Sequence, residues 1–173
     1  MKKISEEVYY SEERLAPVGS KEVDFIRTQA RMNSRKRCRV CVHGSPDDLL
    51  HEMMIALARD SYVRPHKHPG KAESLHIIEG EACLVFFDDD GAITQVTRLA
   101  PVGSKDPFFF RIAEPRFHTI IVQSDALIFH ETTTGPFVRE ETILAPWAPE
   151  EGGDDGRAYQ RQLLDWIART CEG

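Results

Sequence analysis

Short apolar runs separated by turn residues dominate the chain between residues 53 and 144. The runs are rich in β-branched and aromatic residues, and the segments between them contain Gly, Pro, Asp and Ser, as in "DDDG" and "TGP". This pattern is typical of β-strands. "FFDDDGAI" predicts a hairpin, with Gly91 supplying the positive φ that its tip requires. Seven or eight strands at this spacing predict a mainly β fold, an antiparallel sandwich or small barrel.

Helical spacing of apolar residues occurs outside this β region. Residues 20–33 carry apolar side chains three or four positions apart behind Ser20, which is placed to cap a helix. Residues 157–170 show the same spacing and predict an amphipathic C-terminal helix. Ser45 and Pro46 predict the start of a further helix. The segment "LLHEMMIAL" that follows fits either a helix or a strand.

These elements divide the chain into three expected regions. They are an N-terminal arm and helix (1–33), a β-barrel (34–149) and a C-terminal helix (150–173). The octapeptide "RLAPVGSK" occurs at 14–21 and again at 98–105. The residues around the two copies share almost nothing, so we interpret both copies as turns rather than as a sign of duplication.

Composition narrows the classes of function. The chain has 173 residues, 41% hydrophobic and 29% charged, as expected for one globular domain. A net charge of −6 argues against general nucleic-acid binding, which favours a basic excess. No apolar run approaches the ~20 residues that span a bilayer, and acids follow the first lysines where a signal peptide needs an apolar stretch. We therefore expect a cytoplasmic protein with neither nucleic-acid nor membrane partners.

The cysteines predict no disulfide framework, because there are only four and they are spread thinly along the chain. Cys38 and Cys41 do form a CxxC, with His43 close behind. A structural zinc site needs a second pair of ligands, and none is near in sequence. We interpret both as ordinary strand cysteines.

The clearest chemical signal is "RPHKHPGKAESLHIIEG", residues 64–80. On a strand His66 and His68 point to the same side, because side chains alternate between faces. A turn at Pro69 then brings Glu73 back towards the two imidazoles. Two histidines and a carboxylate on one side of a rigid sheet suit a divalent first-row metal with open positions.

A fourth ligand would complete this site, and several histidines compete for the role. His118 is preferred because it begins an alternating strand directly after a proline turn, as His66 follows Pro65. His130, His51 and His43 are the alternatives. His76 lies off the face of Glu73 by alternation and is expected at the surface or in an interface.

Five further residues are candidates to surround the metal. Tyr62 and Arg64 share the expected face of His66, so they are predicted to bind substrate; a salt bridge at the rim is the alternative for the arginine. Arg116 would add positive charge for substrate binding. Lys71 in the loop between the ligands and Glu131 on a late strand are the predicted catalytic groups. If the neighbour of Glu131 faces inward instead, that carboxylate is solvated.

The segment "HKHPGKAESLHIIEG" resembles the first motif of the cupin superfamily, HxH, four residues, E, six residues, G. The second motif is shorter here and lacks its glycine, but it keeps a proline before His118. With "SYVRPHKHPGKAES", "ETTTGPF" and "APWAP", the chain is similar over roughly residues 30–149 to the WbuC-type cupin metalloproteins. Genes of this group often lie in bacterial surface-polysaccharide clusters.

The resemblance implies a cupin double-stranded β-helix, a jelly-roll barrel, with short N-terminal helical elements and a C-terminal helix. It also implies a divalent metal (Zn, Fe, Mn or Ni) held by His66, His68, Glu73 and His118. The expected function is that of an enzyme acting on a small polar, carbohydrate-derived substrate. A non-catalytic module that binds a sugar or acid is the alternative. Barrel edges and the N-terminal arm favour a homodimer.

Overall fold

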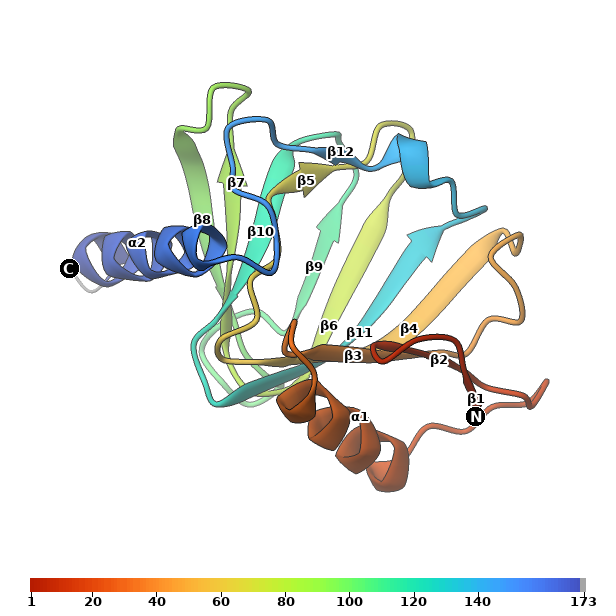
Figure 1. Cartoon of the computed structure of the whole chain (residues 1–173). Helices are drawn as coiled ribbons and strands as arrows, with labels where there is room; N and C mark the ends of the chain where they lie inside the picture. The colour runs from red at the N-terminus through yellow and green to blue at the C-terminus, as the bar shows by residue number, and fades with distance from the viewer. Residues whose placement is uncertain (172–173) are drawn as a thin grey trace.

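Two β-sheets face each other in the computed structural model, which describes residues 1–171 (Figure 1). The larger sheet has the order β1-β2-β3-β4-β11-β6-β9, with bounds Lys2–Lys3, Val8–Tyr10, Arg37–Cys41, Leu50–Ala58, Ala126–Thr134, Glu73–Glu79 and Phe109–Ile112. The smaller has the order β12-β5-β10-β7-β8, with bounds Ile143–Leu144, His66–Lys67, Phe117–Val122, Ala82–Phe87 and Ile93–Leu99. Neighbours such as β4 and β11, β11 and β6, and β5 and β10 are distant in sequence, as in a jelly roll. The predicted mainly β jelly-roll fold is therefore confirmed.

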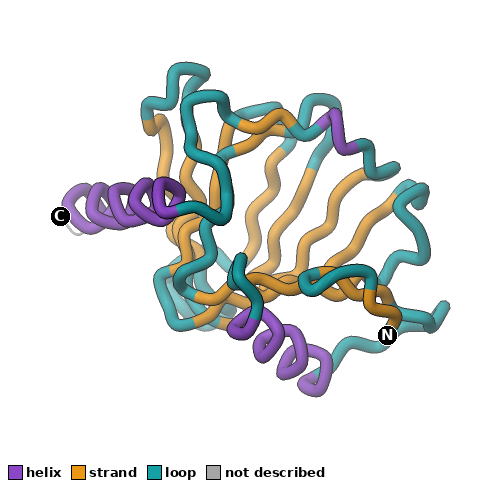
Figure 2. The backbone as a smooth tube through the Cα atoms, in the orientation of Figure 1, coloured by secondary structure: helices purple, strands orange, loops and turns teal. Residues whose placement is uncertain are grey.

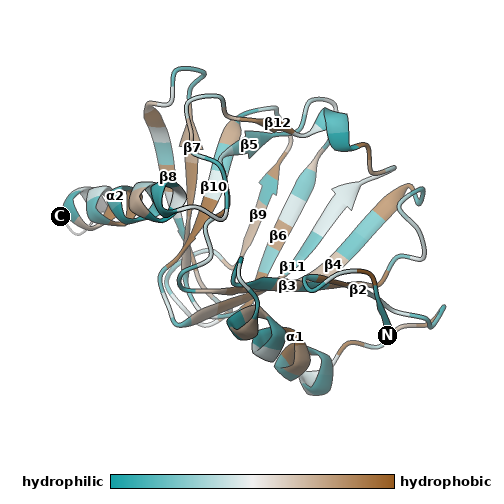
Figure 3. Ribbon diagram, viewed as in Figure 1, coloured by the Kyte–Doolittle hydropathy of each residue, from teal (hydrophilic) through white to brown (hydrophobic). Residues whose placement is uncertain are grey.

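The principal core lies between the sheets. Alternation along β10 sends Ile120 and Val122 into this core, while Ile121 packs on the opposite face. Alternation along β11 similarly sends Leu127 and Phe129 inward. Figure 3 shows β7 and β10 as largely hydrophobic, whereas β6 and β11 carry polar segments. The polar segments of β6 and β11 mark where the core gives way to the candidate site.

Each sheet has a helix on its outer face (Figure 2). The first, α1 (Ser20–Met32), packs against the outer side of β3 and β4. The second, α2 (Asp154–Cys171), covers the outer side of the smaller sheet. The predicted helix at 20–33 is thus confirmed, but its N-cap is Gly19 rather than Ser20. The Gly19 N–H donates to the Glu22 carboxylate at 2.9 Å, which completes this helix start.

The predicted helix start at Ser45 and Pro46 is wrong. The Ser45 hydroxyl accepts from the Asp47 N–H at 3.1 Å, and the Asp48 carboxylate accepts from the Gly44 N–H at 2.7 Å. These local bonds close a turn, which is the alternative that such side chains offer to a helix. The ambiguous segment that follows is the nine-residue strand β4.

The N-terminal arm belongs to the larger sheet. Strand β2 pairs in parallel with β3, and β1 pairs with β2 at the sheet edge. The predicted hairpin joins β7 to β8, with Gly91 at φ 91°. A 3-10 turn, η1 (Arg139–Glu141), leads into β12. None of the described helices is long and apolar enough to cross a membrane.

Candidate metal site

Three histidines meet on the inner face of the smaller sheet. His66 on β5 lies directly across from His118 on β10, and their ring centroids are 4.7 Å apart. His68 follows β5, with its ring 4.9 Å from that of His66. One ring nitrogen of each lies within 4.8 Å of the others, so the three can hold a metal ion.

Backbone carbonyls orient two of these rings. His66 Nδ1 lies 2.8 Å from the Arg64 carbonyl oxygen, and His118 Nδ1 lies 2.9 Å from that of Arg116. A carbonyl oxygen only accepts, so Nδ1 carries the proton and Nε2 is the atom left for a metal. His68 Nδ1 lies 3.3 Å from the Thr142 hydroxyl. The donor set therefore fits a first-row divalent ion.

The Glu73 carboxylate lies between two of these imidazoles. His118 Nε2 is 2.8 Å from Glu73 Oε1, and His68 Nε2 is 4.0 Å from Oε2. Burial opposes both charges, but the shared hydrogen bond holds the pKa of Glu73 below and that of His118 above the ordinary value. Glu73 and His118 therefore form a buried ion pair.

The other two histidines are held neutral. Burial, together with the charges of His118 and His68, lowers the pKa of His66 to about 4. Burial likewise lowers the pKa of His68. A neutral imidazole is the form that binds metal, so the lowered pKa values reduce the competition of protons for these two histidines. Both side chains are only half-buried, which means that solvent reaches them.

The structure places Tyr62 and Arg64 outside the site, so the face predicted for them is wrong. The Tyr62 hydroxyl donates to the Pro149 carbonyl at 3.0 Å, and the Arg64 guanidinium donates to that of Ala145 at 2.8 Å. Val63 between them packs on the inner core. Residues 61–65 form no regular strand, so alternation cannot be carried back from His66 across them.

Lys71 and Arg116 lie at the rim with their charges already engaged. Lys71 Nζ donates to the Pro136 carbonyl at 2.7 Å and pairs with Glu141 at 3.1 Å. It therefore ties the loop after His68 to the 3-10 turn. Arg116 donates to the Thr94 hydroxyl at 2.6 Å, and its guanidinium lies 5.1 Å from the centroid of the Phe86 ring.

Glu131 faces inward, which settles the question of its orientation. Its neighbours Phe129 and Ile128 belong to the inner and outer clusters respectively, and His130 lies 3.7 Å from Glu52 on the outer face. Burial, followed by the charge of Glu73, raises the pKa of Glu131 to about 7. A carboxyl group with that pKa can both donate and accept a proton near neutral pH.

This raised pKa makes stability depend on pH. The folded protein keeps a proton on Glu131 between about pH 4.5 and 7 that the unfolded chain releases, so this contribution to stability is lost as pH rises through that window. We compare metal-free wild type with the metal-free Glu131→Gln variant, which lacks this titrating group. Between pH 4.5 and 7.5, the unfolding free energy of wild type should fall by about 2 kcal/mol more than that of the variant. Urea titrations measure this, with exposed Glu140→Gln as the control. A parallel pH profile for the two proteins would contradict it.

The remaining histidines lie elsewhere. His76 is exposed on the outer face and contacts Phe108, as expected from alternation. His43 and His51 stack on each other with centroids 4.1 Å apart and are not part of the three-histidine group. Cys38 and Cys41 are buried on β3, where the sequence predicted strand cysteines.

Two residues near the site were missed in the sequence. Thr142, which contacts His68, comes from a distant segment and has no local signal. Arg39 does have one: in "RCRVC" the apolar Cys38 and Val40 share one face, which puts Arg39 on the other. That other face is the inner wall of the barrel.

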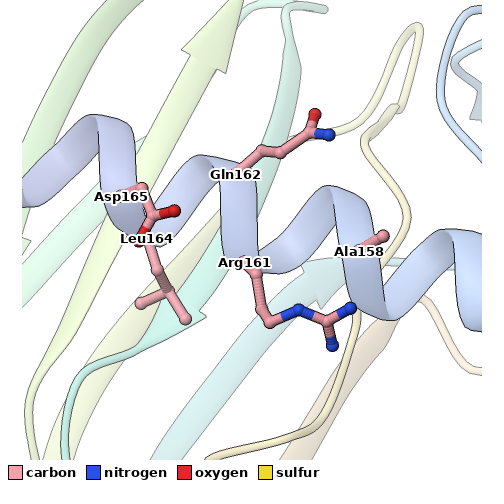
Figure 4. Close-up of a pocket in the computed structure, with 5 residues that line it drawn as sticks. All are labelled: Ala158, Arg161, Gln162, Leu164 and Asp165. Carbon is pink, nitrogen blue, oxygen red and sulfur yellow. The ribbon is translucent and has the colours of Figure 1, made fainter.

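A hollow on the surface of α2 lies apart from this site. A depression of about 380 Å³ lies on α2 and is lined by Ala158, Arg161, Gln162, Leu164 and Asp165. Figure 4 shows that all five side chains come from one helix. Polar groups that converge from several elements are the mark of a binding site, and the depression has none.

Known proteins match this chain over part of its length. A family model described as a domain of unknown function, DUF6016, matches residues 18–99, which is less than half of the chain. No curated protein matches the sequence. Among solved structures, a Shewanella oneidensis protein is similar at 10% identity and TM-score 0.49, covering 60% of this chain and 66% of its own.

Two further structures are similar over part of the chain. Oxalate decarboxylase from Bacillus subtilis has 18% identity and TM-score 0.48, covering 62% of this chain and 27% of its own. The 11S globulin procruciferin from Brassica napus has 15% identity and TM-score 0.42, covering 51% and 21%. This chain thus spans less than two thirds of these structures. At such scores the fold assignment depends on the chain's own topology.

Proposed function

We propose that the protein is a metal-dependent cupin enzyme acting on a small polar, carbohydrate-derived substrate. The observation that carries the proposal is the convergence of three histidines, each with one ring nitrogen within 4.8 Å of the others, beside the Glu73 carboxylate. Half-buried rings in this cluster support an open site rather than a closed structural one.

In this proposal His66, His68, Glu73 and His118 hold the ion. Zn, Fe, Mn and Ni all suit three imidazoles and one carboxylate. When bound, a divalent ion supplies Lewis-acid chemistry and open positions for a hydroxy acid or a sugar diol. The backbone bonds to Nδ1 of His66 and His118 fix the rings, so that the protein binds its ligand without reorganising the site.

Glu131 is the proposed acid–base group. It lies on the inner wall, and its raised pKa favours exchange of a proton with a substrate hydroxyl near neutral pH. Lys71, the other predicted catalytic residue, is proposed instead to position the loop after His68, since its ammonium is held by Pro136 and Glu141.

A non-catalytic module that binds a sugar or acid through its metal is the second candidate. The engagement of Lys71, Arg64 and Arg116 with other protein groups favours it, because few free polar groups then remain around the ion. Turnover of a bound ligand separates the two candidates. A Glu131→Gln variant that keeps binding but loses turnover would identify the enzyme.

The finer likeness to WbuC-type metalloproteins, and with it a role in bacterial surface-polysaccharide metabolism, belongs to this proposal. So do the homodimer and the cytoplasmic location. Metal analysis of protein purified without chelator or nickel resin is the first test, and we expect about one ion per chain. A screen of sugars and hydroxy acids against that protein follows. Absence of a stoichiometric metal would refute the proposed function.

A further inference from the structure

Arg39 on β3 is a charged residue on the inner wall that the metal site does not use. Its neighbours Cys38 and Val40 pack in the cluster beneath α1, so Arg39 faces the space between the sheets. Its positive charge acts on Glu131, across the sheet, and favours the ionised carboxylate. Arg39 is half-buried, so solvent reaches part of it.

The guanidinium of Arg39 lacks a strong acceptor. Its Nε atom is buried with no hydrogen-bond partner, and its side chain contacts the Cys41 thiol, a weak acceptor. Arg37, two residues away on the same strand, pairs with Glu7 and Glu151. A buried charged donor without an acceptor costs stability, which is explained if a ligand supplies the acceptor.

Arg39 and Glu73 lie on the same inner wall of the larger sheet, on strands separated by β4 and β11. Across β4, β11 and β6, Arg39 is in register with Ile77, four residues along β6 from Glu73. Three strand spacings of about 4.8 Å and four residues of about 3.3 Å therefore separate the two backbones by roughly 20 Å. The long arginine side chain and the carboxylate cover part of this span. The remainder fits a ligand of about six carbons.

Arg39 is also the cation best placed to meet an anion here. The inner wall carries the carboxylates Glu73 and Glu131. The predicted anion-binding residue, Arg64, is bound to Ala145 outside the site. A guanidinium binds a carboxylate in a two-pronged geometry that no lysine reproduces.

We propose that Arg39 binds a second carboxylate of a ligand whose hydroxy-acid end chelates the metal, so that the protein selects diacids, such as sugar diacids, over monoacids. This inference rests on the proposed function, since the chelating end requires the ion. It assigns Arg39 a role in specificity rather than in the reaction itself.

Matched pairs of acids on the Co(II)-loaded protein test the inference. Gluconate and glucarate share a hydroxy-acid end, and only glucarate has a second carboxylate; lactate and malate form a shorter pair. The visible spectrum of Co(II) reports binding at the ion. In at least one pair we expect the diacid to bind at least tenfold more tightly to wild type. Arg39→Gln should abolish that preference and leave the monoacid within twofold.

Arg37→Gln is the control, because it removes a charge from the same strand without touching the unpaired donor; it should keep the preference. If Arg39→Gln fails to fold, Arg39→Lys is used in its place. The lysine keeps the positive charge but loses the two-pronged geometry, so most of the preference for the diacid should still disappear. The inference would be overturned if wild type preferred neither diacid over its monoacid. It would also be overturned if the Arg39 variant lost the same affinity for the monoacid and the diacid of a pair. Failure to bind Co(II) would instead overturn the proposed function.

Discussion

Replacing His118 with alanine should weaken metal binding by at least about 100-fold. His118 supplies one of the three clustered ring nitrogens and hydrogen-bonds Glu73 at 2.8 Å, so its loss removes a donor and the partner that orients the carboxylate. His66→Ala should have an effect of similar size, because His66 lies across from it in the sheet. Calorimetric titration of metal-free protein with Zn(II) or Mn(II) measures both.

The matched control is His76→Ala, since His76 is exposed on the outer face of β6. It should bind metal like wild type. Thermal unfolding of the metal-free variants separates loss of a donor from loss of the fold. Full retention of metal by either His66→Ala or His118→Ala would refute the assignment of that residue as a ligand.

Replacing Gly80 with alanine should destabilise the fold by at least ~3 kcal/mol. Gly80 has φ 80°, and an added Cβ would lie 2.1 Å from the Ala126 carbonyl oxygen and 2.5 Å from the Ser124 hydroxyl. The carbonyl belongs to the backbone of β11, so it cannot move without shifting the strand that carries Glu131. Urea unfolding at one pH measures the change.

Gly103→Ala separates backbone strain from collision. Gly103 has φ 100° but no atom within 4 Å of the added Cβ. It should therefore lose only about 1 kcal/mol, the cost of a left-handed conformation for a residue with a side chain. Equal destabilisation of the two variants would show that the close approach at Gly80 is unimportant.

Local patterns predicted much of this molecule because their causes are local. Alternation along β6 and β10 is a property of each strand, so it placed Glu73 and His76 on opposite faces correctly. The hairpin at Gly91 follows from the backbone freedom of one residue. The same reasoning failed at Tyr62 and Arg64, because irregular backbone before His66 interrupts the alternation.

The repeated octapeptide "RLAPVGSK" shows the limit of local patterns. In the copy at 14–21 its last two residues begin α1, and Gly19 is an extended N-cap with φ −133°. In the copy at 98–105 the same letters end β8 and form a turn, with Gly103 at φ 100°. Identical residues thus adopt two conformations. The first copy leads into α1, which packs against β3, whereas the second copy turns the chain after β8.

The sequence by itself therefore determined most of the strands, the two long helices and the motif of His66, His68 and Glu73, all of which depend on neighbours in the chain. The tertiary structure decided which distant groups meet. Strand order sets His118 across from His66 and places Glu131 and Arg39 on the same inner wall of the larger sheet. Pairing between strands far apart in sequence depends on the packing of both sheets, and no single segment encodes it.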